Sequence, residues 1–165
     1  LQISVGVAVT HEKQPFSQGR GSGGWTSQTS AANWTKHPLS TPSMRSNRGS
    51  HYSTTNKRFT APVAGVYLIQ VSWYAYYPGG GDTSGSQYMH PVIYVNGAPN
   101  WNNSMTPYTI YGHDIFDTTS HYIAPTLSQS IYLSANDYAE IFVYSRDSDL
   151  DFYENYTYFA FQLIG

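Results

Sequence analysis

Large apolar residues recur at every second position in several stretches of this chain, and this alternation constrains the fold more than any other feature. In the stretch Gly65–Tyr76, four large residues fall on one side of an extended backbone: Tyr67, Ile69, Val71 and Trp73. A repeat of two is the signature of a β-strand, and no part of the sequence shows a convincing helical repeat. We therefore expect an all-β protein.

Further stretches of this kind are separated by glycine, proline and Asn-Gly turn signals. The expected strands are Ile3–Val9, Trp34–Leu39, Phe59–Ala61, Gly65–Tyr76, Tyr88–Val95, Pro107–Ile110, Tyr122–Leu133, Tyr138–Tyr144 and Tyr156–Ile164. A polar, glycine-bearing loop is expected from His11 to Gly24. This number and spacing of strands predicts a single domain over residues 1–165, folded as an antiparallel sandwich or jelly roll.

The last expected strand is apolar on both faces. Phe159, Phe161 and Leu163 share one face, and Tyr156, Tyr158, Ala160 and Ile164 share the other, interrupted by Gln162. A strand that meets water should be polar on its outer side, and no helix is available to cover this one. A further copy of the chain is the simplest cover. The alternative is that this face stays in contact with water, which the tyrosine hydroxyls would make tolerable. The expected interface residues are Leu68, Tyr74, Tyr156, Tyr158 and Ala160.

Composition excludes several classes of function. The formal net charge is −2 and only 11% of the 165 residues are charged, so a basic surface for nucleic acid is absent. No apolar run approaches the roughly 20 residues that span a bilayer, and we expect no membrane insertion. There is no cysteine nucleophile, no phosphate-binding glycine loop and no Gly-x-Ser-x-Gly motif, so we expect no enzyme. A glycan-degrading enzyme that uses a carboxylate pair such as Asp114 and Asp117 is the remaining catalytic alternative.

The segment around residues 47–71 resembles the signature of the C1q domain. Asn47, Tyr52, Phe59, Gly65 and Tyr67 fall at the spacing of that family. Thr41, Ile69 and Val71 depart from it, because the family has aromatic residues at those positions. The strand ending at Asn96-Gly97, the pair flanking Asn136-Asp137 and the closing aromatic strand follow in the order of the family.

The resemblance implies a C1q/TNF-like jelly roll of about ten strands, a homotrimer and ligand binding without catalysis. The segment Ala31–Lys36, the absence of cysteine and the Ser/Asn/Gly-rich loops look more like the viral members of the family. The leading prediction is thus a virion surface module, either a tail-fibre tip or a capsid decoration protein, which binds a host receptor (glycan or protein) or neighbouring capsid or tail proteins. The alternative is a secreted, extracellular lectin or cytokine-like ligand of the animal type.

Two candidate sites lie in the loops that the family topology places opposite the chain termini. The first is a set of tyrosines that can stack on sugar faces or pack against a protein, whether a ligand or another subunit. Its members are Tyr74, Tyr76, Tyr77, Tyr88 and Tyr153. The second is the alternating series Asp147, Asp149 and Asp151, whose carboxylates suit Ca²⁺ but equally fit a solvated acidic loop. No other cofactor is expected.

Overall fold

A computed structural model describes residues 14–27, 33–36, 42–77, 88–100, 110–111, 121–124, 126–145 and 151–165. Regular structure in these ranges is β-strand, apart from one turn of 3-10 helix, Glu154–Tyr156. The strand pairs found there are all antiparallel. Within the same ranges, no helix has the length and apolar character needed to span a membrane. The all-β prediction is confirmed.

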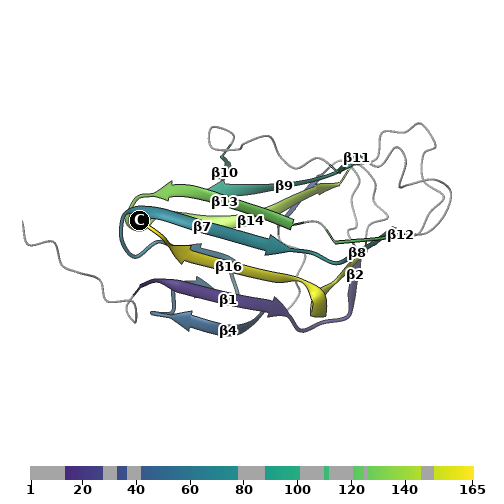
Figure 1. The fold of residues 1–165 in the computed structure, drawn as a ribbon, viewed down its shortest axis with the longest axis horizontal. Helices are drawn as coiled ribbons and strands as arrows, with labels where there is room; N and C mark the ends of the chain where they lie inside the picture. The colour runs from purple at the N-terminus through teal and green to yellow at the C-terminus, as the bar shows by residue number, and fades with distance from the viewer. Residues whose placement is uncertain are drawn as a thin grey trace, which may run out of the picture.

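Two larger sheets face each other (Figure 1). The five-stranded sheet has the order β13 (Thr126–Leu133), β7 (Gly65–Ser72), β16 (Tyr158–Leu163), β1 (Phe16–Gly21) and β4 (Pro42–Arg48). The opposite sheet has the order β10 (Ala98–Pro99), β9 (Tyr88–Val95), β14 (Tyr138–Ser145), β6 (Arg58–Thr60) and β5 (Tyr52–Ser53), with β3 (Asn33–Lys36) paired to β14 and β11 (Ile110–Tyr111) paired to β9. Apart from the hairpins β5–β6 and β9–β10, the neighbours in these two sheets are far apart in the sequence, as in a jelly roll.

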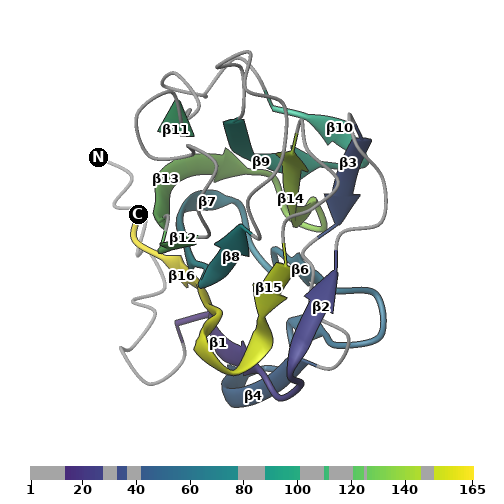
Figure 2. The same ribbon diagram turned by 90° about the vertical axis from the view of Figure 1, so that its right-hand side faces the viewer.

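A third, smaller sheet lies at the end of the molecule opposite the C-terminus (Figure 1). Its order is β12 (His121–Ile123), β8 (Ala75–Tyr77), β15 (Asp151–Tyr153) and β2 (Trp25–Ser27). Each strand is joined along the chain to a strand of the five-stranded sheet, and the order of the two sheets corresponds. In Figure 2, which looks at this end, β8 and β15 lie near the centre, between strands of the larger sheets. The small sheet is thus a bent continuation that crosses the end of the sandwich.

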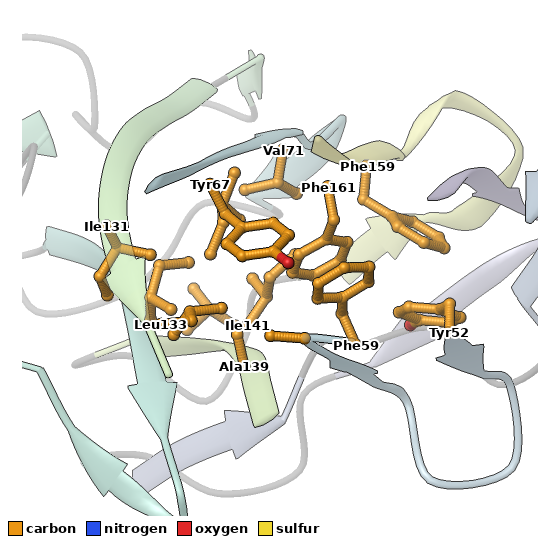
Figure 3. Close-up of a cluster of buried hydrophobic side chains, with 14 of the residues drawn as sticks. Tyr52, Phe59, Tyr67, Val71, Ile131, Leu133, Ala139, Ile141, Phe159 and Phe161 are labelled. Carbon is orange, nitrogen blue, oxygen red and sulfur yellow. The ribbon is translucent and has the colours of Figure 1, made fainter. Parts of the chain in front are cut away.

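The core between the sheets combines aliphatic side chains with a group of aromatic rings that pack on one another (Figure 3). Phe59 stacks on Phe161 with ring centroids 5.0 Å apart and planes 4° apart. Tyr52 lies 4.7 Å from Phe159 in the same measure, and Tyr67 lies 5.4 Å from Phe59. Offset ring pairs of this kind add to the free energy gained by removing the rings from water.

The residues of the C1q-like signature form one structural unit. The side chain of Asn47 accepts hydrogen bonds from the Ser17 hydroxyl at 2.8 Å and the Tyr52 amide at 3.0 Å, and it donates one to the Tyr52 carbonyl at 2.9 Å. Gly65 has no room for a side chain, because a Cβ there would lie 2.5 Å from the carbonyl oxygen of Gly165. The signature therefore fixes where β4 and β5 meet the core and where β7 begins.

The expected loop His11–Gly24 is wrong over part of its length, because Phe16–Gly21 forms β1 between β16 and β4. The inward-facing residues of β1 are small: Ser17, Gly19 and Gly21. A Cβ on Gly19 would lie 2.6 Å from the Phe159 ring, so the partner strand supplies the bulk that the sequence pattern lacks. The expected strand Ile3–Val9 lies outside the described residues.

Two long expected strands are each divided where the small sheet bends away. Gly65–Tyr76 becomes β7 and β8, with Trp73 and Tyr74 between them, and Tyr122–Leu133 becomes β12 and β13. The alternation of faces continues through the first break, since Trp73 and Ala75 remain in the core. The closing strand begins at Tyr158, two residues later than expected, because residues 154–156 form the 3-10 turn.

Candidate functional site

The outer face of the five-stranded sheet carries apolar and uncharged polar side chains, with arginines at the β4 edge: the guanidinium of Arg45 lies 5.7 Å from the centroid of the Tyr158 ring, and that of Arg48 lies 5.7 Å from the centroid of the Phe16 ring. The residues that the sequence assigned to an interface there, Leu68, Tyr158 and Ala160, point away from the core, since their neighbours along each strand are buried. Tyr132 on β13 and Ile164 after β16 extend the apolar part toward the C-terminal end, and they are 61% and 50% exposed. This face has no cover among the described residues.

A hollow of about 390 Å³ lies in the same face, over β7 and toward the small sheet. Its lining is mainly apolar, with amide and hydroxyl groups from Gln18, Gln70, Ser128 and Tyr158 among the apolar side chains. The side chains of Gln70 and Ser128 are within 3.5 Å of each other across the β7–β13 pair. Its walls contain no charged residue, so it is fitted to uncharged groups rather than to an ion.

Six aromatic side chains gather on the outer face of the small sheet and its flanks, and we call them the distal cluster. They are Trp25, Tyr74, Tyr76, Tyr122, Tyr153 and Tyr156. Trp25 and Tyr153 have ring centroids 4.9 Å apart, and Tyr74 stacks on Tyr122 at 5.5 Å. Trp25 is 46% exposed, Tyr156 55% and Tyr122 61%. The opposite face of the same sheet carries the fully buried Phe152 and Ala75, which belong to the core.

A buried carboxylate holds the distal cluster in place. Glu154 is completely buried, accepts a hydrogen bond from the amide of Gly23 at 3.2 Å, and donates its own amide to the carbonyl of Gly24 at 3.0 Å. A Cβ on Gly21 would lie 2.5 Å from the backbone of Glu154, so the segment packs closely against it. Because Trp25 follows this segment and Tyr153 precedes Glu154, the turn fixes both rings relative to each other.

The structure brings three of the predicted binding tyrosines together, namely Tyr74, Tyr76 and Tyr153. Tyr77 and Tyr88 belong to β8 and β9, and the positions of their side chains lie outside the described part. Tyr74 and Tyr156, predicted for the subunit interface, lie in the distal cluster where it borders the outer face of the five-stranded sheet.

Sequence reasoning missed Trp25 and Tyr122. Trp25 follows the segment that was expected to be loop, and Tyr122 was expected to be the first residue of one long strand, Tyr122–Leu133, rather than part of a separate strand β12. The alternation still contains a signal for Tyr122, because Tyr122 and Ile123 would face opposite sides of any strand. For Trp25 the signal was a large aromatic residue directly after the glycine-rich run Gly21-Ser22-Gly23-Gly24.

The calcium prediction rests on residues that the structure describes only in part. Asp147 and Asp149 lie outside the described residues, as do Asp114 and Asp117. Asp151 lies on β15, paired with Ser27 on one side and Tyr76 on the other. The described residues contain no group of three or more His, Asp or Glu side chains placed to hold a metal ion. A calcium site at Asp147, Asp149 and Asp151 stays a prediction.

A second aromatic group covers the outer face of the opposite sheet, with Trp34 beside Tyr144 and Tyr94 stacked on Phe142 at 3.9 Å. All four rings are half-buried against one another. Beside them, the buried carboxylate of Glu140 pairs with both Lys36 and Arg58. The rings of this face are less exposed than Trp25, Tyr122 and Tyr156, so this face is less available for binding than the distal cluster.

Comparison with known proteins identifies the fold. Among solved structures, the globular domain of zebrafish complement 1qA matches with a TM-score of 0.52 and 16% identity, over 92% of this chain and 98% of that one. The Eiger TNF of S. frugiperda matches with a TM-score of 0.59 and 12% identity, over 93% of this chain and 94% of the other. Murine APRIL gives 0.56 and 11%, over 92% of this chain and all of APRIL.

These likenesses confirm the C1q/TNF-like jelly roll. No protein-family model matches the sequence, and no curated protein does. At 11 to 16% identity the structural matches establish the fold and leave the partner of this chain to be argued from its own residues.

Proposed function

We propose that the protein is a non-enzymatic recognition module that assembles as a homotrimer and presents its distal cluster to a partner. The observation that carries the proposal is the pair of exposed surfaces on one continuous bent sheet. One surface is broad and lies along the sandwich, and the other lies across its end. Two surfaces of different shape suit two different tasks.

Assembly is assigned to the outer face of the five-stranded sheet. Val66, Leu68, Ala160 and Ile164 place aliphatic groups on this face, which in a monomer would meet water. Extended apolar patches on soluble proteins usually mark interaction sites. The polar groups of the hollow, such as Gln70 and Ser128, have room there to pair with their copies around a threefold axis. The C1q resemblance implies that the number of copies is three.

Partner binding is assigned to the distal cluster, because it lies at the end of the sandwich rather than along its side. A closed symmetric assembly built through the sides leaves its ends free. Three copies would then present three equal clusters in the same direction. Such an arrangement converts weak single contacts into strong binding when the partner also repeats.

The proposal has two finer forms. In the first, favoured by the sequence, the trimer is a virion surface module at a fibre tip or on a capsid. In the second it is a secreted, extracellular ligand of the animal type. The structural neighbours named above come from zebrafish, an insect and mouse, and this observation supports the second form.

Mass measurement in solution tests the assembly. Light scattering after size exclusion should give three times the 18.4 kDa of the chain. Ala160→Glu places a charge at the centre of the proposed interface and should give folded monomers, since an unpaired buried charge opposes association. Ala135→Glu, in an exposed turn, is the matched control and should remain trimeric. A folded wild-type monomer at micromolar concentration would contradict the proposal.

A further inference from the structure

We infer that the distal cluster binds a neutral glycan by stacking sugar rings on its aromatic faces. This inference rests on the recognition role proposed above and names the chemical class of its ligand. It is drawn from four properties of the cluster: the arrangement of its rings, its charge, its composition and its rigidity.

The rings form inclined facets rather than one flat plate. Trp25 is tilted by 45° to Tyr153, and Tyr76 is tilted by 41° to Tyr122. Trp25 and Tyr122 are 6.2 Å apart between centroids, and both expose about half of their surface. A pyranose has an apolar face of C–H groups, whose weak positive charge complements the negative face of an aromatic ring. Successive sugars of a glycan are also inclined to one another, so a faceted surface matches a chain of them.

The charge of the site selects a neutral ligand. The four strands of the small sheet contain no lysine or arginine, and their one acidic residue is Asp151, paired with Tyr76. Among the described residues of the small sheet, sialic acid, sulfate or phosphate groups would find no lysine or arginine and would be repelled by the carboxylate of Asp151. A neutral sugar, in contrast, can donate hydroxyl protons to Asp151 and exchange hydrogen bonds with the phenol groups.

The composition of the cluster also argues against a protein as the ligand. Protein–protein interfaces are enriched in methionine and arginine as well as aromatic residues. Besides the aromatic rings, the described outward-facing side chains of the small sheet include Asp151 but no methionine, arginine, leucine or valine. Rings with hydroxyl groups and no aliphatic side chains between them are better suited to a ligand that is itself covered in hydroxyls.

The cluster is rigid before any ligand arrives. Glu154 fixes the segment before Trp25, as described above, and the amide of Tyr153 donates to the carbonyl of Tyr74 at 2.8 Å. The Thr157 hydroxyl donates to the carbonyl of Tyr153 at 3.2 Å. Tyrosine and tryptophan side chains also have few rotatable bonds. Little conformational entropy is therefore lost on binding, which a weakly interacting ligand such as a sugar requires.

The test is binding of the intact protein to an array that carries neutral, sialylated and sulfated glycans, followed by calorimetry with the best neutral oligosaccharide. Trp25→Ala and Tyr122→Ala should each weaken binding at least about tenfold, equivalent to about 1.4 kcal/mol. Tyr122→Phe keeps the ring and should bind within about threefold of wild type. Trp34→Ala removes a tryptophan from the other aromatic face and is the matched control. The mass of every variant is measured in parallel.

Three results would overturn the inference. The first is a folded trimer that binds no neutral glycan on the array. The second is binding only to sialylated or sulfated glycans. The third is binding of a neutral glycan that is abolished by Trp34→Ala and unaffected by Trp25→Ala. The inference would also be overturned if the protein bound a protein partner through Trp25 and bound no neutral glycan. A monomer that binds neutral glycans through Trp25 and Tyr122 would support the ligand class and refute only the trimer, so the two proposals fail separately.

Discussion

The buried core and the distal cluster are built from the same residue types, yet they differ in what the rings touch. In the core, Phe59 and Phe161 lie between two sheets and are at most 1% exposed. In the distal cluster, Trp25 and Tyr122 rest on one side of a single sheet and meet water on the other. Aromatic content alone therefore says little about role, and the presence or absence of a second layer decides it.

The two regions also differ in how their positions are fixed. Core rings are held by one another, as in the parallel pair Phe59 and Phe161. The distal rings are positioned by their backbone, which the buried Glu154 and the glycine segment packed against it hold in place. Truncating a ring should therefore damage the fold in the first region and only the surface in the second.

The largest effect is expected when a core ring is compared with a distal ring. Phe59→Ala should lower the free energy of unfolding by about 3–5 kcal/mol, because it removes buried contacts and leaves a cavity. Tyr122→Ala should lower it by about 1 kcal/mol or less, because the ring is mostly in water. Urea unfolding at one fixed protein concentration measures both. Equal losses would erase the distinction between the two regions.

A smaller effect is expected from the segment that supports Trp25. Gly21→Ala would force a Cβ against the backbone of Glu154, and it should lower the free energy of unfolding by about 1–3 kcal/mol. Gly24→Ala is the matched control, since a Cβ at that position would have no neighbour within 4 Å, and it should stay within about 0.5 kcal/mol of wild type. If both changes were neutral, the segment would not be the rigid support described above.

The smallest effect concerns pH at the margin of the core. Burial lowers the pKa of His51, whose ring stands edge-on to Phe59 with centroids 6.3 Å apart. The unfolded chain then binds this proton more readily than the folded one, so stability is full above the ordinary pKa of 6.5 and falls as the pH drops through it. Urea midpoints at pH 7.5 and 5.5 should differ in wild type and differ less in His51→Gln. If the two midpoints differed as much in His51→Gln as in wild type, the pH dependence of stability would come from a group other than His51.

Much of the fold followed from alternation, and the exceptions have physical causes. The faces of Gly65–Ser72 and of the closing strand were predicted correctly because bulky residues mark their buried sides. The strand Phe16–Gly21 was missed because its buried side is Ser17, Gly19 and Gly21, which are small to make room for rings such as Phe159. A strand whose buried side chains are smaller than its exposed ones can be recognised only when its partner strand is known.

The candidate site was predicted in part for a related reason. Tyr74, Tyr76 and Tyr153 could be grouped because the expected topology put their loops at one end. Trp25 and Tyr122 joined them only through the small sheet, whose two outer strands pair with β15 and β8. The bends that create this sheet depend on how the sandwich closes, and local sequence does not specify that.

Hydroxyl-radical footprinting of the assembled protein, read by mass spectrometry, tests most directly whether one aromatic surface is covered by other copies while the other stays free. Tyr122 and Tyr132 are both 61% exposed in the single chain, the first in the distal cluster and the second on the outer face of the five-stranded sheet. We expect Tyr132 to be protected and Tyr122 to be oxidised, with protection of Tyr132 lost in Ala160→Glu. Equal oxidation of the two tyrosines in the wild-type protein would contradict the proposed assembly.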